Sequence, residues 1–196
     1  MKRWQIVLTG TLLVFVGSWL AYRTLTFNLP KQMILETNYG PITLELLTEA
    51  APATVKNFVK LAESGFYDGT LFHRVVRGFM IQGGDPLTRE FPKDWPRHGT
   101  GGPGYGFADE RNGLALTRGV VAMANSGPNT NGSQFFIVTA ARVDWLNGLG
   151  QPWHTPFARV IEGMAVVDKI NQVAVDRNSH PLQEVRIERI ERAELK

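Results

Sequence analysis

The sequence predicts a mainly β protein that folds as a closed antiparallel barrel capped by two helices. Short segments of alternating or continuous apolar residues recur along the chain, each bounded by Gly, Pro, Asn or Asp. Only two stretches have the 3.6-residue period of a helix that faces a core. A length of 196 residues allows one well-buried core. We expect the sheet to close, because closure removes the unpaired edges that would otherwise aggregate.

Composition narrows the class of protein. Apolar residues make up 43% of the chain and charged residues 20%, which is typical of a globular protein rather than a disordered one. The chain has no cysteine, which excludes disulfides, thiolate metal sites and a cysteine nucleophile. The net charge of +3 is small and the basic residues are mixed with acids, so we expect no nucleic-acid partner.

Residues 1–31 form an N-terminal segment and linker outside the predicted domain, which covers residues 32–196. A basic start, Met1–Arg3, precedes an apolar run from Ile6 to Tyr22 with no charged residue. Its length favours one hydrophobic membrane-spanning helix, and the basic start favours a cytoplasmic N-terminus. We therefore expect an uncleaved anchor in the inner (cytoplasmic) membrane, with the domain on the extracytoplasmic, periplasmic side. The alternative is a cleaved signal sequence, which would give a secreted or periplasmic protein.

The domain is predicted to open with two strands and a helix. Gln32–Thr37 and Ile42–Leu46 alternate apolar and polar residues on either side of the turn Asn38–Pro41. Pro52 suits the first turn of a helix, and Gly65 suits the position just past its end.

Two more strands, joined by a tight bend, are predicted within Phe72–Asp85. This stretch is rich in large apolar residues, and Arg77-Gly78 interrupts it as a turn would. Arg74 is unusual there. Its stem could lie on apolar surface with its head in water, or its guanidinium could donate into a dry pocket.

A long irregular segment is expected from Asp85 to about Asn112. The spacing Gly99-x-Gly101-x-x-Gly104 formally matches a dinucleotide-binding fingerprint. No strand precedes it, and Pro103 stands where a helix should open, so we reject that interpretation. A close-packed surface loop is the better reading.

The second half is predicted to contain three strands, a short helix and a final strand. The strands are Val120–Ala124, Gln134–Thr139 and Pro156–Ile161. Apolar spacing predicts the helix from Met164 to Ile170, and the alternation of Val185–Ile190 predicts the last strand.

No residue pattern supports metal, cofactor or nucleophilic chemistry. The four histidines lack metal-ligand spacing, and the chain has neither a nucleophile elbow nor a phosphate-binding loop. The remaining candidate is an apolar pocket with a few polar donors, which suits a small apolar group beside a peptide unit. The plausible walls are Phe79, Met80, Phe136 and Leu146, and the plausible polar points are Arg74, Gln82, Asn125 and Gln134.

Two long motifs resemble a known family. Tyr67–Thr70 followed by Phe72–Asp85 looks like the signature of the cyclophilin-type peptidyl-prolyl cis-trans isomerases, here of a bacterial type with an N-terminal anchor or signal. Met123–Phe136 is similar to the family's second hallmark. The resemblance covers about Gln32 to Ala193. It implies an eight-stranded antiparallel barrel capped by two helices, and a rotamase that needs no cofactor or metal and assists the folding of extracytoplasmic proteins.

The resemblance also implies roles for individual residues. Arg74 would be the catalytic residue. The proline pocket and the groove for the substrate backbone would be formed by Phe79, Met80, Gln82, Ala124, Asn125, Gln134, Phe136, Leu146 and His154. The partners would be proline-containing polypeptides, bound by a monomer.

The chain departs from the family pattern at one rim of the expected groove. Residues 149–153 are extra, the stretch before Trp145 is one residue longer, and Ala158 replaces a glycine. Such a rim leaves open a second function, a binding module that holds proline-containing segments without turnover. A barrel that carries an apolar ligand is disfavoured, because Phe72 and Phe135 would fill so small an interior.

Overall fold

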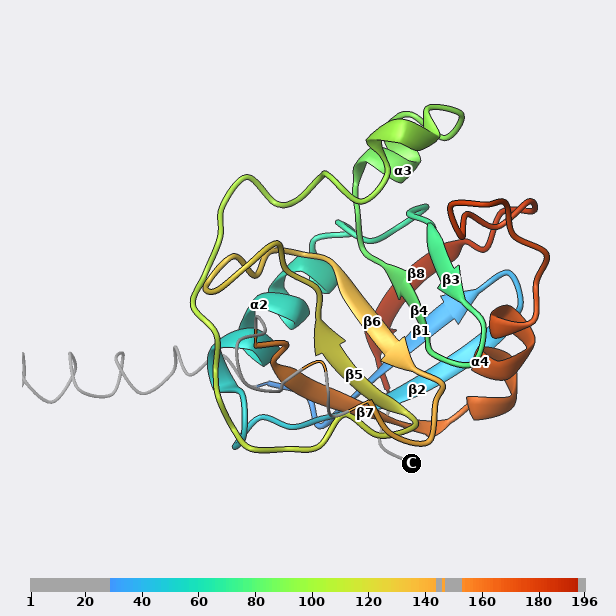
Figure 1. The fold of residues 1–196 in the computed structure, drawn as a ribbon. Coiled ribbons are helices and arrows are strands. Elements are labelled where there is room, and N and C mark those ends of the chain that lie inside the picture. Colours follow the sequence, from blue (N-terminus) through green and yellow to red (C-terminus); the bar gives the residue numbers. More distant parts are fainter. Residues whose placement is uncertain (1–28, 144–145, 147–152, 194–196) are drawn as a thin grey trace, which may run out of the picture.

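The computed structural model describes residues 29–143, 146 and 153–193. The predicted membrane anchor or signal sequence lies almost entirely outside these residues, and so does Trp145. No helix in the described part of the chain combines the length and hydrophobicity needed to cross a membrane. Figure 1 shows the described residues as a curled sheet with helices at its periphery.

Eight antiparallel strands form one sheet, which confirms the mainly β prediction. Their order across the sheet is β3-β4-β6-β5-β7-β2-β1-β8. The strands are β1 (Gln32–Thr37), β2 (Gly40–Leu46), β3 (Arg74–Val76), β4 (Met80–Gly83), β5 (Val120–Met123), β6 (Phe135–Val138), β7 (Pro156–Glu162) and β8 (Ile187–Arg192).

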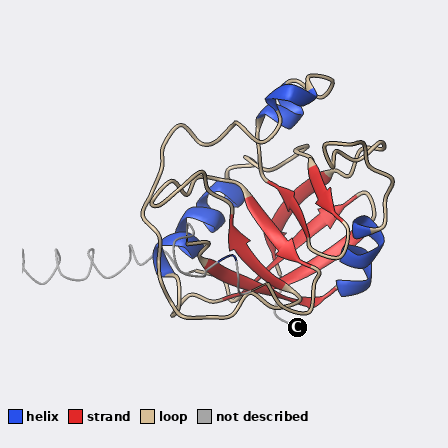
Figure 2. Ribbon diagram, in the orientation of Figure 1, coloured by secondary structure: helices blue, strands red, loops and turns tan. Residues whose placement is uncertain are grey.

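The sheet does not close into the expected barrel. The end strands β3 and β8 share no ladder, and the sheet curls into an open half-barrel (Figure 2). A single bridge between Leu71 and Arg186, with a 2.8 Å bond from the Phe72 N–H to the Val185 carbonyl, spans part of the gap. β8 begins at Ile187 rather than at Val185, because the Val185 carbonyl bonds across the gap and Arg186 bonds to Asn38 just after β1.

Both predicted helices are present, α2 (Pro52–Glu63) and α4 (Met164–Asn171), and they lie at different ends of the curled sheet (Figure 1). Helix α2 has no capping side chain of its own, because Ala51 precedes it. The Glu110 carboxylate supplies the cap instead by accepting bonds from the N–H groups of Ala53 and Thr54 at 3.1 and 2.8 Å.

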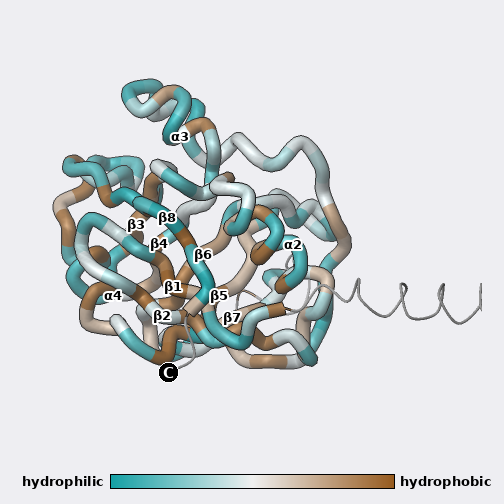
Figure 3. Tube along the Cα trace, turned by 180° about the vertical axis from the view of Figure 1, so that it is seen from behind, coloured by the Kyte–Doolittle hydropathy of each residue, from teal (hydrophilic) through white to brown (hydrophobic). Residues whose placement is uncertain are grey.

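The segment expected to be irregular contains two short helical turns, α3 (Leu87–Glu90) and the 3₁₀ helix η1 (Trp95–Arg97). Both begin beside a proline, and neither has enough residues for a periodic apolar pattern to reveal it. In Figure 1 α3 stands away from the sheet, and much of it is hydrophilic in Figure 3.

The alternation of side chains along β4, β5 and β6 divides the buried residues between two clusters. Ile81, Val121 and Ile137 face the main core, which also holds the fully buried Phe72 and Phe135. Their neighbours face the opposite side of the same three strands and form a second, smaller cluster with Leu116 and Val143: Met80, Ala122, Phe136 and Val138. This second face carries the candidate site.

Candidate functional site

A cavity of about 300 Å³ opens over the second cluster. It brings together all of the predicted site residues except Gln134, although these residues are spread over about half of the domain sequence. The lining residues are Arg74, Phe79, Met80, Gln82, Ala124, Asn125, Phe136, Leu146 and His154.

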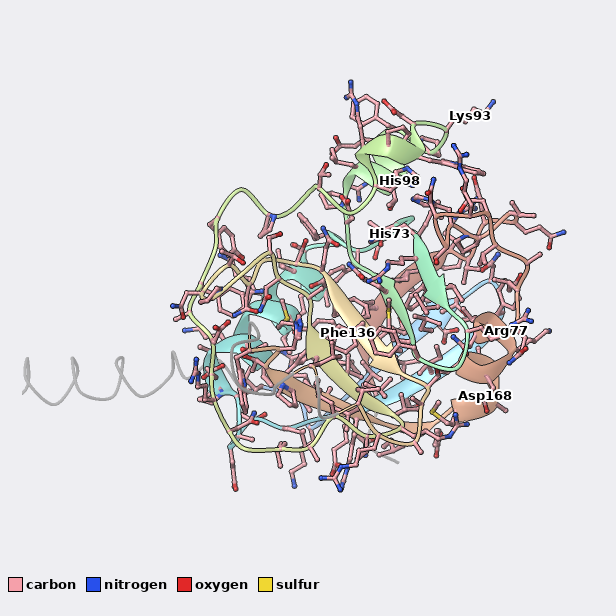
Figure 4. All side chains as sticks on the ribbon, in the orientation of Figure 1. His73, Arg77, Lys93, His98, Phe136 and Asp168 are labelled. Atoms are coloured by element: carbon pink, nitrogen blue, oxygen red, sulfur yellow. The ribbon has the colours of Figure 1, made fainter. Side chains whose placement is uncertain are left out.

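The floor of the cavity is apolar because of strand register. Residues opposite each other in antiparallel strands share a face, and Gln82 lies opposite Phe136, which lies opposite Ala122. Phe136 is only 5% exposed and Met80 only 2%. Figure 4 shows Phe136 on β6, near the middle of the sheet. Such a floor suits a compact apolar ring.

His154 forms one wall of the cavity. Its ring lies edge-on to Phe136, with centroids 5.4 Å apart at 85°, and its Nδ1 is 3.1 Å from the Met123 carbonyl oxygen. Burial lowers the pKa of His154, since a low-dielectric surrounding disfavours the charged ring. A neutral imidazole is therefore expected there, and it extends the apolar wall.

Arg74 provides the charged group at the cavity. It lies opposite Gln82 in the β3–β4 ladder, and its Nη1 donates to Gln82 Oε1 at 3.2 Å. Among the described residues no Asp or Glu forms an ion pair with Arg74. A guanidinium has five N–H donors, and this bond uses one. Arg74 is exposed and also lines the cavity, so its head group lies at the cavity mouth in contact with water.

Gln134 lines a neighbouring cavity of about 410 Å³. The two cavities share Gln82, Ala124 and Asn125, so together they form one extended groove. The glycine-rich loop Gly99–Tyr105 contributes to the wall of the second cavity. Ser126 and Thr130 also line the cavity, but they were not singled out from the sequence. Both lie within the hallmark motif Met123–Phe136, but neither was assigned a role from it.

Asn125 stands where the two cavities meet. Its side-chain Nδ2 donates to the Trp153 carbonyl oxygen at 2.7 Å, which fixes the residue just beyond the end of β5. Leu146 and His154 flank the extra residues of the rim, and both line the first cavity. The longer rim therefore leaves these two side chains at the cavity.

The other three histidines, His73, His98 and His180, line neither cavity of the groove. His73 is buried, with 4% of its surface exposed, and neither of its ring nitrogens has a hydrogen-bond partner among the described residues. His98 and His180 are half-buried, and the His180 ring stacks on Trp95 with centroids 5.7 Å apart. Figure 4 shows His98 between the α3 segment and His73. In the part of the chain that the structure describes, no three His, Asp or Glu side chains are grouped so as to hold a metal ion.

Comparison with known proteins gives one consistent family. The model of the cyclophilin-type peptidyl-prolyl cis-trans isomerase family matches residues 32–192. A Neurospora crassa protein named peptidyl-prolyl cis-trans isomerase-like 1 is 49% identical over 160 residues, covering 78% of this chain and 88% of its own. Its human namesake is 45% identical over 165 residues, covering 81% and 90%.

Solved structures agree. A Cryptosporidium parvum cyclophilin-type isomerase superposes with a TM-score of 0.74 at 32% identity, covering 85% of this chain and 99% of the other. A second structure of that protein, determined in the presence of the dipeptide Ala-Pro, gives a TM-score of 0.72 at 33% identity, covering 84% and 99%.

Proposed function

Because this chain belongs to the cyclophilin-type peptidyl-prolyl cis-trans isomerases, we propose that the cavity beside Arg74 is its active site and holds the proline ring of an X–Pro segment. The family membership gives the reaction, rotation about the X–Pro peptide bond. The observation that carries the site is the convergence of Arg74 with an apolar floor in one cavity.

The reaction needs no nucleophile. Resonance sets a barrier of roughly 18–20 kcal/mol to rotation about the C–N bond, and no bond has to break. In the twisted transition state the proline nitrogen becomes pyramidal and gains a lone pair. Arg74 donates a hydrogen bond to that nitrogen. The planar amide offers little lone-pair density there, so the bond is selective for the transition state.

Arg74 alone does not account for the rate. A hundred-thousand-fold acceleration requires about 7 kcal/mol. One charge-assisted hydrogen bond contributes roughly 1.5–3 kcal/mol. The remainder comes from a dry, rigid pocket that holds the ring while the carbonyl turns. Phe79, Met80, Phe136 and Leu146 form that pocket, with His154 at its side.

The polar residues of the groove hold the substrate backbone. The Ala124 and Asn125 backbone lies where the two cavities meet, and Gln82 and Gln134 are linked by a 3.0 Å hydrogen bond across the groove. These groups bind the residues that flank the proline and guide the rotating carbonyl. The presence of Ala-Pro with the Cryptosporidium parvum relative supports a proline-containing ligand.

The clients are extracytoplasmic polypeptides that need help to fold. This assignment rests on the predicted anchor at residues 6–22 and on the basic residues before it. The enzyme works as a monomer, since each chain contains a whole groove.

A protease-coupled proline-isomer assay of the full chain in detergent tests the site. Arg74→Ala is expected to retain the fold and to lose about 10- to 150-fold in kcat/KM, the equivalent of one charge-assisted hydrogen bond. Arg77→Ala is the matched control, because Arg77 lies in the turn after β3 and bonds to the Gln172 carbonyl instead. Near-normal turnover by Arg74→Ala would refute the proposed site. Proline-peptide binding with no turnover by the wild type would favour the binding-module alternative.

A further inference from the structure

We propose that Asp85 is a positioning residue for the isomerase reaction, because it holds the Gly101 carbonyl that aligns Gln134, Gln82 and Arg74. The inference rests on the proposed role of Arg74. Asp85 itself lines neither cavity of the groove.

The Asp85 carboxylate is completely buried, yet in the described part of the chain no Lys or Arg pairs with it. A buried carboxylate is costly unless hydrogen bonds compensate for the lost water. Three backbone N–H groups do so. Leu87 donates to Oδ1 at 2.8 Å, and Gly99 and Gly101 donate to Oδ2 at 2.5 and 3.1 Å. The carboxylate thus ties the end of β4 to the glycine loop of the groove.

Gly101 lies tightly against this carboxylate. A Cβ atom at that position would be 2.1 Å from Asp85 Oδ1 and 2.7 Å from the Leu87 Cγ. Both distances are far below normal contact, so only glycine allows the loop to approach so closely. The position of the Gly101 backbone is therefore set by Asp85.

A chain of hydrogen bonds runs from Gly101 to the catalytic arginine. The Gly101 carbonyl accepts from Gln134 Nε2 at 2.8 Å. Gln134 Oε1 accepts from Gln82 Nε2 at 3.0 Å, and Gln82 Oε1 accepts from Arg74 Nη1 at 3.2 Å.

The Gly101 carbonyl and the Arg74 guanidinium, at the two ends of this series of hydrogen bonds, select the same orientation of both glutamine amides. A carbonyl can only accept, so it draws the Gln134 NH₂ group toward the glycine loop. A guanidinium can only donate, so it draws the Gln82 oxygen toward Arg74. Each glutamine then has one orientation that satisfies both of its neighbours.

Loss of the Asp85 carboxylate should loosen the alignment of Gln134, Gln82 and Arg74. If the Gly101 carbonyl moves, Gln134 loses one of its two partners, and the Gln82 amide that supports Arg74 is no longer fixed. A hydrogen bond made only in the transition state depends strongly on the placement of its donor. The expected defect is therefore in turnover rather than in substrate binding.

Two variants of the full chain test the link at different points. Asp85→Asn keeps the shape but presents an NH₂ group to the backbone donors. Gly101→Ala keeps the carboxylate and displaces the loop. Each is expected to lower kcat by about tenfold with KM little changed, as for the loss of one neutral hydrogen bond. If Asp85→Asn does not fold, Gly101→Ala decides.

Gly106→Ala is the matched control. It makes the same change in the same loop region, and a Cβ there would meet nothing closer than 3.6 Å. We expect wild-type turnover. We also expect the side-chain amide NMR signals of Gln82 and Gln134 to shift in Asp85→Asn and Gly101→Ala and to stay in place in Gly106→Ala.

A double-mutant cycle separates positioning from general damage. In a Gln134→Ala background, Asp85→Asn should lower kcat little further, because the series of hydrogen bonds from Gly101 to Arg74 is already interrupted at Gln134. Multiplied losses would overturn the inference, and so would unshifted amide signals. If Arg74→Ala is impaired while Asp85→Asn and Gly101→Ala match wild type, the positioning role alone is wrong. If Arg74→Ala is itself near normal, the proposed function fails instead.

Discussion

The chemical value of Arg74 lies in its neighbours as much as in its charge. Its one described hydrogen-bond partner is the neutral Gln82 amide, and the cavity beside it is lined mostly by apolar groups. An acidic partner would compete with the substrate for the guanidinium, whereas an amide orients it without neutralising it. Arginine suits this role because its donors lie in a fixed plane.

Arg74→Lys should therefore lose activity although it keeps the positive charge. A lysine ammonium is a compact point charge on a flexible stem, so it cannot bond Gln82 and the substrate nitrogen in the same fixed geometry. We expect kcat/KM to fall about tenfold in the coupled assay. Arg77→Lys, the control, should match wild type. Equal activity of Arg74→Lys and wild type would show that charge alone suffices.

His73 should make the stability of the domain depend on pH. Burial lowers its pKa to about 4, against a raising effect of the Asp85 charge and lowering effects of His98 and His180. The folded state thus holds His73 neutral, while the unfolded chain protonates it near pH 6.5. Its contribution to stability is complete above pH 6.5 and is lost as the pH falls toward 4. From the two pKa values the loss is about 3 kcal/mol.

Urea titrations between pH 7.5 and 4 measure this effect. His73→Gln should show a free energy of unfolding that falls less between pH 6.5 and 4 than that of wild type. His98→Gln removes a histidine from the adjacent loop and should keep most of the wild-type slope. Equal slopes for wild type and His73→Gln would contradict the assignment.

At the scale of elements, the β3–β4 hairpin depends on helix α4. Asn171, buried at the end of α4, accepts from the Gly78 N–H at 2.8 Å and donates to the Val76 carbonyl at 3.0 Å. These bonds hold the turn between the two strands that carry Arg74 and Gln82. A helix far along the sequence thereby fixes the hairpin that carries Arg74 and Gln82.

Asn171→Ala should weaken both stability and catalysis. Leaving the hairpin turn without its partners is expected to lower the free energy of unfolding by about 1–3 kcal/mol. The activity of the folded fraction should fall as well, because the turn sets the spacing of Arg74 and Gln82. Gln172→Ala is the control, since its exposed side chain is not part of this contact. Chemical denaturation and the coupled assay together give both values, and an unchanged stability would exclude the proposed tie.

Strands and helices could be predicted from the sequence where the apolar residues follow a single regular spacing. Alternation marked β1 and β2, and a 3.6-residue period with Pro52 and Gly65 marked α2. Helix α3 was missed, because four residues cannot display a period. The start of β8 was placed too early, because Val185 alternates like a strand residue but pairs across the gap in the sheet. Pairing partners are not visible in a local pattern.

At the scale of the whole molecule, the residues of the groove were easier to predict than the shape of the sheet. The motifs and the alternation along the strands predicted that Met80 and Phe136 lie on one face, and both line the cavity. Closure depended on whether β3 could pair with β8. The contact across the gap is made by Leu71 and Phe72, which precede β3, and β3 itself pairs only with β4 among the described strands. The roles assigned to the groove residues stay predictions.

The N-terminal segment would determine how close the domain lies to a membrane. Leu29, the first described residue, packs against the main core, so the chain leaves the domain at a fixed point. Five residues lie between it and Arg23, the first charge after the apolar run, so the two are at most about 20 Å apart when the chain is extended. An uncleaved anchor would therefore hold the groove close to the membrane surface, where it meets polypeptides as they emerge.

We expect the full chain to remain with membranes through an alkaline carbonate wash and to be digested by protease added to the extracytoplasmic side. A chain that starts at Leu29 should be released to the soluble fraction and keep its isomerase activity, because the groove is built from later residues.

Reversal of Lys2 and Arg3 to Glu should reduce correct insertion if these charges set the orientation. A mature N-terminus near Trp19, found by mass spectrometry of the membrane-exported protein, would establish a cleaved signal and contradict the anchor.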